Sequence, residues 1–403
     1  MISPRALAIS ALAVFALTTD AVSQDRPRLR DLGVTVGVLA PGPLNAITDV
    51  DGVLVGQVTV TDGDRVNTGV TAIRPHGGSL YHDRVPAAMY VGNGFGKLLG
   101  VTQVRELGEL ETPVLLTCTL CVWKAADAMV EWALEQPGME NVGSLNAVVG
   151  ETNDGGLNDI RNRPITPAHV REAIETASGG PVEEGSVGAG RGTRAFGWKG
   201  GIGTSSRVLP ESLGGFTVGV LVQSNFGGIL AMAGAPVGQE LGRYSFRNAI
   251  EGDSQDQGAG AGDAEGAPTS EWTDEDEGQG SIMIVVATDA PLSPFKLERL
   301  AKRAIMGLAR TGSFAGNGSG DYVIAFSTAE GVRRQPDEEW TELIEVPNDR
   351  ISALFEGAVE ATQEAIYNSL LKATTVSGMG RTADAIDVDE VARVLREYNV
   401  LRP

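Results

Sequence analysis

Histidine is scarce in this sequence: among 403 residues there are only His76, His82 and His169. A serine hydrolase usually takes its base from a histidine that is held by a carboxylate. The G-x-S-x-G pattern of a nucleophile elbow is also missing. We therefore expect no conventional catalytic triad. A zinc site is not expected either, since such a site usually needs four ligands and few histidines and cysteines are present.

Cysteine is nearly absent, and both cysteines, Cys118 and Cys121, lie in the segment PVLLTCTLCVW. The apolar context predicts a strand, in which residues three apart point to opposite faces and lie about 10 Å from each other. A disulfide needs Cα atoms within about 7 Å. The spacing therefore predicts buried, reduced cysteines rather than a disulfide, a redox motif or a metal site.

Positive charge is also limited, with 32 Lys and Arg against 52 Asp and Glu and a net charge of −20. Half of that excess lies in residues 251–280, which contain ten acidic residues and no Lys or Arg. No basic stripe is present to neutralise phosphates, so nucleic acid is not expected as a partner.

Long hydrophobic runs are missing except at the N-terminus, where residues 6–17 are apolar and follow Arg5. Small residues at 21–23 form a cleavage site of the secretory type, and the run is too short to span a bilayer. We predict a signal peptide over 1–23, a mature protein that is periplasmic or secreted, and no membrane attachment after its removal. A buried N-terminal helix is the alternative.

Strand and helix patterns are present in both halves of the chain. Alternating or continuous apolar segments predict strands near 47–63, 69–78, 110–122, 214–230 and 281–291. Helical spacing is found at 124–136, 293–312 and 352–371. This distribution favours one layered α/β (α+β) domain over separate modules. Two glycine-rich segments, 92–97 and 188–192, lack the spacing of phosphate or dinucleotide loops and are predicted to be tight turns.

The acidic segment 251–280 is followed at once by the apolar run SIMIVVATDAP. Its composition cannot bury enough surface to offset chain entropy, which is typical of a surface loop or a linker. Cleavage between Gly280 and Ser281 is a second interpretation. It would give Ser281 a hydroxyl nucleophile and an α-amine with a pKa of about 7.7–8, which suits a base near neutral pH.

Motifs over nearly the whole mature chain support that interpretation, because the sequence resembles the L-aminopeptidase/D-amidase–esterase (DmpA-like) family, which includes the β-peptidyl aminopeptidases. The motifs that carry the resemblance are NAITDVDGVLVGQVT (45–59), NTGVTAI (67–73), VGNGFGKLLGVTQVRELGELETPVLLT (91–117), GETNDGGLNDIR (150–161), GSVGAGRGTRAFGWKGGIGTSSR (185–207), VQSNFG (222–227), SIMIVVATDAPL (281–292) and ARTGSFAGNGSGDYVIAFST (309–328).

The resemblance implies an αββα sandwich of the DmpA/ornithine-acetyltransferase type, similar to N-terminal-nucleophile hydrolases but with different connectivity. It also implies a precursor that cuts itself into an α chain, 24–280, and a β chain, 281–403. The two chains would form one catalytic domain, and αβ units would assemble into a homotetramer. No metal and no organic cofactor are implied.

The same resemblance assigns roles to particular residues. Ser281 matches the nucleophile, Ser319 the serine that hydrogen-bonds it, and Asn225 the oxyanion donor. Glu151 matches the carboxylate that binds the free ammonium group of the substrate. By themselves these residues would be ordinary loop or turn residues.

Two positions depart from the family pattern. Asp321 replaces a glutamate, so its side chain is one methylene shorter and its reach toward Ser319 is in question. Asn153 and Gly156 lie in the region where some relatives carry an aromatic residue, which would make the pocket on the acyl side more open or more polar.

The function that these motifs imply is a self-processing serine aminopeptidase. It would take the N-terminal residue, an α- or β-amino acid, from short peptides, amides or esters. Two alternatives stay open. One is an exported binding protein without catalysis on the same scaffold. The other is a self-processing acyltransferase, a class that usually has threonine in place of Ser281.

Overall fold

The computed structural model describes residues 26–256, 280–336, 339–340 and 342–401. The predicted signal peptide, 1–23, lies outside the described residues, as does most of the acidic segment. The beginning of that segment differs from the expectation of a structureless insert, because helix α5 (Arg247–Asp256) continues through it. An ion pair from Arg247 to Glu251, one helical turn along, supports this helix.

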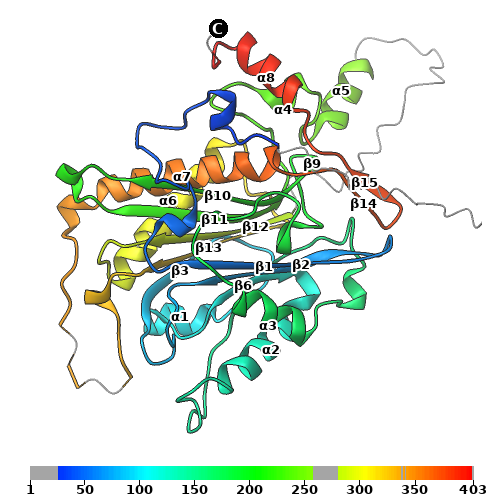
Figure 1. The fold of residues 1–403 in the computed structure, drawn as a ribbon. Coiled ribbons are helices and arrows are strands. Elements are labelled where there is room, and N and C mark those ends of the chain that lie inside the picture. Colours follow the sequence, from blue (N-terminus) through cyan, green and yellow to red (C-terminus); the bar gives the residue numbers. More distant parts are fainter. Residues whose placement is uncertain (1–25, 257–279, 337–338, 341, 402–403) are drawn as a thin grey trace, which may run out of the picture.

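Two sheets lie face to face at the centre of the molecule (Figure 1). The larger sheet has the strand order β10 (Gly201–Val208), β11 (Thr217–Phe226), β12 (Gly280–Thr288), β13 (Ser319–Ser327), β3 (Val85–Gly94) and β5 (Glu109–Leu110). The smaller sheet has the order β1 (Leu54–Asp62), β2 (Val66–Arg74), β6 (Val114–Cys118), β7 (Val148–Thr152) and β4 (Leu98–Leu99).

Helices cover the outer face of each sheet. Helices α6 (Pro294–Arg310) and α7 (Ser352–Leu371) pack on the larger sheet, and α2 (Val122–Leu134) and α3 (Pro167–Glu175) on the smaller. Shorter elements surround these layers: α1 (Val101–Leu107), α4 (Val237–Glu240), α8 (Val388–Glu397) and the hairpins β8 (Arg194–Ala195) with β9 (Trp198–Lys199) and β14 (Val376–Gly378) with β15 (Arg381–Ala383). This is the layered α/β domain that the residue patterns predicted, with the αββα arrangement that the family resemblance implied.

Side chains along β12 alternate between the two hydrophobic cores that lie on either side of the larger sheet. Ile282 and Ile284 belong to the core beneath α6 and α7, whereas Met283 and Val285 belong to the core between the two sheets. Ser281 comes one residue before this alternation begins, two residues from Met283. The start of β12 therefore places Ser281 at the end of the core between the sheets.

The helix α7 also contains buried charge. Arg207 on β10 is fully buried and donates to Glu360 at 2.9 Å and to Glu364 at 2.7 Å, both on α7. A buried ion pair of this kind is costly to break, because removing one partner leaves the other charged in a low-dielectric interior. The ion pairs of Arg207 with Glu360 and Glu364 link residues that lie on the two sides of position 280 in the sequence.

None of the helices in the described ranges, from α1 to α8, is long and apolar enough to cross a bilayer.

Candidate active site

A cavity of about 860 Å³ opens where several central strands begin or end. Its lining includes Ser281 and Gly280 at the start of β12, Asn225 near the end of β11, and Glu151 near the end of β7. Ser281 is paired with Asn225 on the antiparallel neighbour β11 and with Gly320 on the parallel neighbour β13. The fold thus brings together residues that lie far apart in the sequence.

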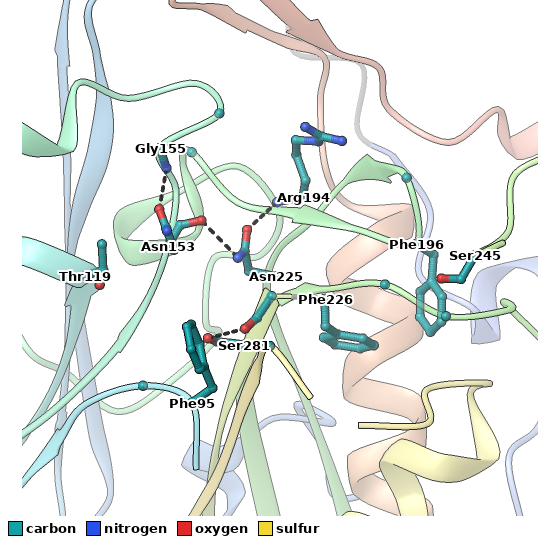
Figure 2. Close-up of a pocket in the computed structure, with 18 of the residues that line it drawn as sticks. Phe95, Thr119, Asn153, Gly155, Arg194, Phe196, Asn225, Phe226, Ser245 and Ser281 are labelled. Carbon is teal, nitrogen blue, oxygen red and sulfur yellow. Dashed lines mark hydrogen bonds between the residues drawn. The ribbon is translucent and has the colours of Figure 1, made fainter. Parts of the chain in front are cut away.

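Ser281 directs its hydroxyl at the peptide bond that precedes it. Its Oγ donates to the carbonyl oxygen of Gly280 at 2.5 Å (Figure 2). Gly280 has a φ of +139°, and a Cβ there would lie 2.1 Å from the carbonyl oxygen of Asn225. Only glycine tolerates this backbone and this close approach.

Gly320 keeps space for the hydroxyl on the other side. A Cβ at this position would lie 3.1 Å from Ser281 Oγ and 2.7 Å from the carbonyl oxygen of Phe95. A larger residue would therefore push against the backbone and against the hydroxyl of Ser281.

Asn225 is held in one orientation by two backbone groups. Its Oδ1 accepts from the N–H of Arg194 at 2.9 Å, and its Nδ2 donates to the carbonyl oxygen of Asn153 at 3.0 Å (Figure 2). An amide nitrogen carries two hydrogens, so one remains for an oxygen in the cavity. Because Ser281 is directly opposite on β12, this donor suits an oxyanion formed there.

Ser319 and Asp321 form a buried pair on β13. The hydroxyl of Ser319 donates to Asp321 Oδ1 at 2.8 Å, so the shorter aspartate does reach the serine. Burial raises the pKa of Asp321 to about 6, and the hydrogen bond from Ser319 opposes this rise. Its second oxygen has no hydrogen-bond partner among the described residues.

The hydrogen bond expected between Ser319 and Ser281 is not among those of the described uncut chain. Ser319 is paired across the ladder with Gly280, so it lies beside the bond expected to be cut. The hydrogen bond between the two serines remains a prediction for the cut enzyme. Asn93 was not singled out from the sequence, yet its side chain donates to the carbonyl oxygens of Ser319 and Gly316 and holds this loop.

Glu151 is buried, and the ammonium group of Lys97 lies beside it. Its Oε1 accepts from the backbone N–H of Lys97 at 3.0 Å and from Lys97 Nζ at 3.1 Å. The same Nζ donates to Thr119 at 2.8 Å. Glu151 Oε2 has no hydrogen-bond partner within the part of the chain that the structure describes. Glu151 lines the cavity, so it lies where a carboxylate that binds a substrate ammonium group is expected, with Lys97 already paired to its Oε1.

Lys97 and Phe95 belong to the glycine-rich segment 92–97, which was predicted to be a tight turn. The chain does turn here, between β3 and β4, and residues 94–97 also line the cavity. Two glycines in a short loop allow its backbone to approach the carboxylate, and a Cβ at Gly96 would lie 3.2 Å from Glu151 Oε1. Sequence spacing alone gave no signal for this proximity.

The prediction of reduced cysteines is wrong. Cys118 and Cys121 form a disulfide with Cα atoms 5.1 Å apart, although both are buried as expected. The reason is that β6 ends at Cys118 and a 3₁₀ turn follows over Thr119–Cys121. The turn brings the two side chains together, where a continued strand would have separated them.

The three histidines lie away from the cavity. His76 contacts the carbonyl oxygen of Asp83, His82 that of Gly138, and the ring of His169 accepts from the N–H of Thr166. All three are within the described residues and none lines the cavity, which leaves no place for a serine–histidine pair at Ser281.

Comparisons with known proteins agree with this architecture. Residues 45–383 match the model of Peptidase family S58. The chain is 40% identical to the beta-peptidyl aminopeptidase BapA of Sphingosinicella microcystinivorans over 96% of each chain. It also resembles two solved structures. Each alignment covers 94% of this chain and the whole of the chain in the solved structure. One is a Burkholderia sp. beta-aminopeptidase, with 38% identity and a TM-score of 0.80. The other is the L-aminopeptidase D-Ala-esterase/amidase of Ochrobactrum anthropi, with 36% identity and a TM-score of 0.81.

The Ochrobactrum enzyme is described as a prototype of the serine aminopeptidases with a variant of the Ntn hydrolase fold. Matches of this identity and coverage do not favour the two alternatives, a binding protein or an acyltransferase. The chain belongs to Peptidase family S58, the DmpA-like family, and is a serine aminopeptidase.

Proposed function

We propose that this chain is a precursor that cuts its own Gly280–Ser281 bond, and that the new N-terminal serine then removes the N-terminal residue from short peptides, amides or esters. The contact of 2.5 Å from Ser281 Oγ to the Gly280 carbonyl oxygen carries this proposal. A hydroxyl so close to a carbonyl oxygen also lies beside the carbonyl carbon that it would attack.

The cut needs two steps. Ser281 Oγ attacks the Gly280 carbonyl carbon, the C–N bond breaks, and the hydroxyl proton passes to the leaving nitrogen, which leaves an ester between the two residues. Water then hydrolyses the ester and frees the carboxylate of Gly280 and the amine and hydroxyl of Ser281.

In the cut enzyme the same groups act on a substrate. The α-amine of Ser281 takes the hydroxyl proton, the oxygen attacks the substrate carbonyl, and Asn225 Nδ2 stabilises the oxyanion. The proton passes to the leaving amine, and water later hydrolyses the acyl-enzyme. Ser319 and Asp321 would relay the proton beside the amine, and Glu151 would hold the ammonium group of the substrate.

The two chains would remain one folded unit after the cut. Strand β12 begins the β chain, yet it is hydrogen-bonded to β11 of the α chain along its whole length. The buried pair of Arg207 with Glu360 also joins the two chains. Assembly of these αβ units into a homotetramer is part of the proposal and rests on the family resemblance.

Export to the periplasm or the medium also belongs to the proposal. The predicted signal peptide supports it, and so does the disulfide of Cys118 and Cys121, since structural disulfides persist mainly in oxidising compartments. Peptides with an N-terminal β-amino acid are the first substrates to test, because the relative with 40% identity is named a beta-peptidyl aminopeptidase.

Intact mass spectrometry of the purified protein, beside Ser281→Ala, tests the proposal. Two chains are expected, the smaller one beginning at Ser281, while the variant stays whole. A single uncut wild-type chain that still hydrolyses peptide substrates would refute Ser281 as an N-terminal nucleophile. Cleavage of Ser281→Ala at the same bond would refute the role of its hydroxyl.

A further inference from the structure

The charged side chains that line the active-site cavity are almost all cationic. Among the described lining residues only Glu151 is acidic, although the chain as a whole has 52 Asp and Glu against 32 Lys and Arg. The cationic lining residues are Lys97, Arg194, Arg243, Arg247 and Arg381. A random set of residues from this acidic chain would contain more acidic than basic side chains. The excess of basic side chains in the lining therefore makes part of the cavity attractive to anions.

The cations fall into two groups by position. Lys97 is paired with Glu151 and with Thr119, and Thr119 lies on one side of Ser281 and Asn225 in Figure 2. Arg194 lies on the other side in the same view, and so does Ser245, which is two residues from Arg243. The cavity therefore has Glu151 at one end and Arg194 and Arg243 at the other, with Ser281 between them.

Three separate segments supply the arginine side, which we define as Arg194, Arg243, Arg247 and Arg381. Arg194 begins β8, Arg243 precedes α5, Arg247 begins α5, and Arg381 begins β15. Guanidinium groups bind carboxylates through two parallel hydrogen bonds, which makes them specific for that planar anion.

Arg194 is tied directly to the catalytic geometry. Its backbone N–H holds Asn225 Oδ1 at 2.9 Å, so its side chain starts next to the proposed oxyanion donor. A Cβ at Gly156 would lie 3.4 Å from Arg194 Nη1, and Gly156 lines the same cavity. The small residue at 156 therefore leaves the guanidinium room at the cavity wall.

Arg243 is held beside the cavity by its surroundings. Its Nη1 donates to the carbonyl oxygen of Gly197 at 3.0 Å, and the guanidinium lies 5.4 Å from the centre of the Trp198 ring. It also pairs with Asp384, whose carboxylate oxygen is 3.5 Å away on a side chain that is 58% exposed. Such a solvated pair is weak.

We infer that the arginine side binds a carboxylate on the leaving group of the substrate, so that zwitterionic short peptides are preferred over neutral amides. This inference rests on the proposed function, since it needs Ser281 to act between the two ends. The substrate ammonium would pair with Glu151, and the carboxylate of the released part would lie among the arginines. That carboxylate is either the C-terminus of a dipeptide or the side chain of an acidic second residue.

The test compares four substrates with the same N-terminal β-alanine: β-Ala-Gly, β-Ala-Gly-amide, β-Ala-Asp-amide and β-Ala-p-nitroanilide. We expect kcat/KM for β-Ala-Gly to exceed that for its amide by about 10-fold, as one charge-assisted contact supplies. Arg243→Gln should remove most of this preference while leaving p-nitroanilide turnover within about twofold, and Arg194→Gln should also remove most of the preference. Arg393→Gln, on the exposed face of α8, is the matched control and should change neither value.

The outcomes separate the two sources of the carboxylate. If β-Ala-Asp-amide is cleaved as well as β-Ala-Gly, the site accepts a side-chain carboxylate. If only β-Ala-Gly is cleaved faster than its amide, the site binds the C-terminal carboxylate.

Equal kcat/KM for β-Ala-Gly and its amide in the wild type would overturn the inference, as would a preference that survives Arg194→Gln/Arg243→Gln. If the wild type cleaves none of the four substrates, nor their α-alanyl counterparts, the proposed function fails. In that case, calorimetry that compares the binding of β-Ala-Gly and of its amide to the wild type tests the carboxylate site independently of turnover.

Discussion

Replacement of Asn225 gives the sharpest test of the proposed chemistry. In the structure Asn225 Oδ1 accepts from the N–H of Arg194 and Nδ2 donates to the carbonyl oxygen of Asn153. Asn225→Asp keeps the size of the side chain and an acceptor for Arg194, but it replaces Nδ2 by an oxygen and so removes both the donor for the cavity and the hydrogen bond to Asn153. Asn225→Ala removes all three interactions and leaves two backbone groups without their partners.

The expected loss can be estimated from the donor alone. Removing one oxyanion donor typically lowers kcat by about 10²–10³-fold, or about 2.7–4 kcal/mol of transition-state stabilisation. Asn225→Ala should add a folding cost of about 1–3 kcal/mol from the unpaired backbone groups. Asn225→Asp should lose at least as much kcat, because a negative charge beside the developing oxyanion is repulsive.

The assay must separate the self-cleavage from the turnover of substrate, because the same donor would stabilise both transition states. Intact mass spectrometry over time gives the fraction cut, and single-turnover release of p-nitroaniline gives the rate per cut chain. Thermal denaturation of each variant shows whether the fold persists. A variant that is cut fully and retains kcat within about threefold of the wild type would refute Asn225 as the oxyanion donor, since the expected loss is far larger.

Three further predictions concern single residues. Glu151→Gln should raise KM for free-amine substrates by about 10–100-fold through loss of the charged partner, with little change for N-acetylated esters, as measured by steady-state kinetics. Gly280→Ala should block the cut, because its Cβ would meet the carbonyl oxygen of Asn225 at 2.1 Å; gel analysis that shows normal processing would contradict this. Asp321 has a pKa raised from 3.8 to about 6 by burial, so the folded chain binds more protons than the unfolded chain between these values. Its contribution to stability therefore falls by about 3 kcal/mol as pH rises through that range. Uncut Ser281→Ala/Asp321→Asn should then unfold at higher denaturant than uncut Ser281→Ala at pH 7.5 and show less difference at pH 4, and the reverse order would sink the argument.

Much of the fold could be predicted from the sequence because its signals are local. The helical faces of 293–312 and 352–371 and the apolar run after Ser281 follow from side-chain periods that depend on neighbouring residues only. The predicted helices are found as α6 and α7, and the predicted run is β12, the strand at whose start the cavity opens. The motif resemblance likewise named Ser281, Asn225 and Glu151, which the structure brings to one cavity, although their catalytic roles remain to be measured.

The prediction about the cysteines failed because the strand ends within the apolar pattern and a turn follows. The apolar pattern through Cys118 continues past the end of β6, and nothing in it marks the 3₁₀ turn that allows the disulfide. The glycine-rich segment 92–97 was correctly expected to bend, but its composition could not show that the bend faces Glu151, which is 54 residues from Lys97 in the sequence.

The sequence by itself determined the strand and helix segments, the family and the serine at the start of β12, because each depends on short stretches of chain. Only the tertiary structure decided the pairing of Lys97 with Glu151, the fit of Asp321 to Ser319, and the lining of one cavity by Glu151 and four arginines. These features depend on which strand ends meet at one end of the sandwich. That meeting is set by long-range sheet pairing, for which no short stretch of sequence carries a signal.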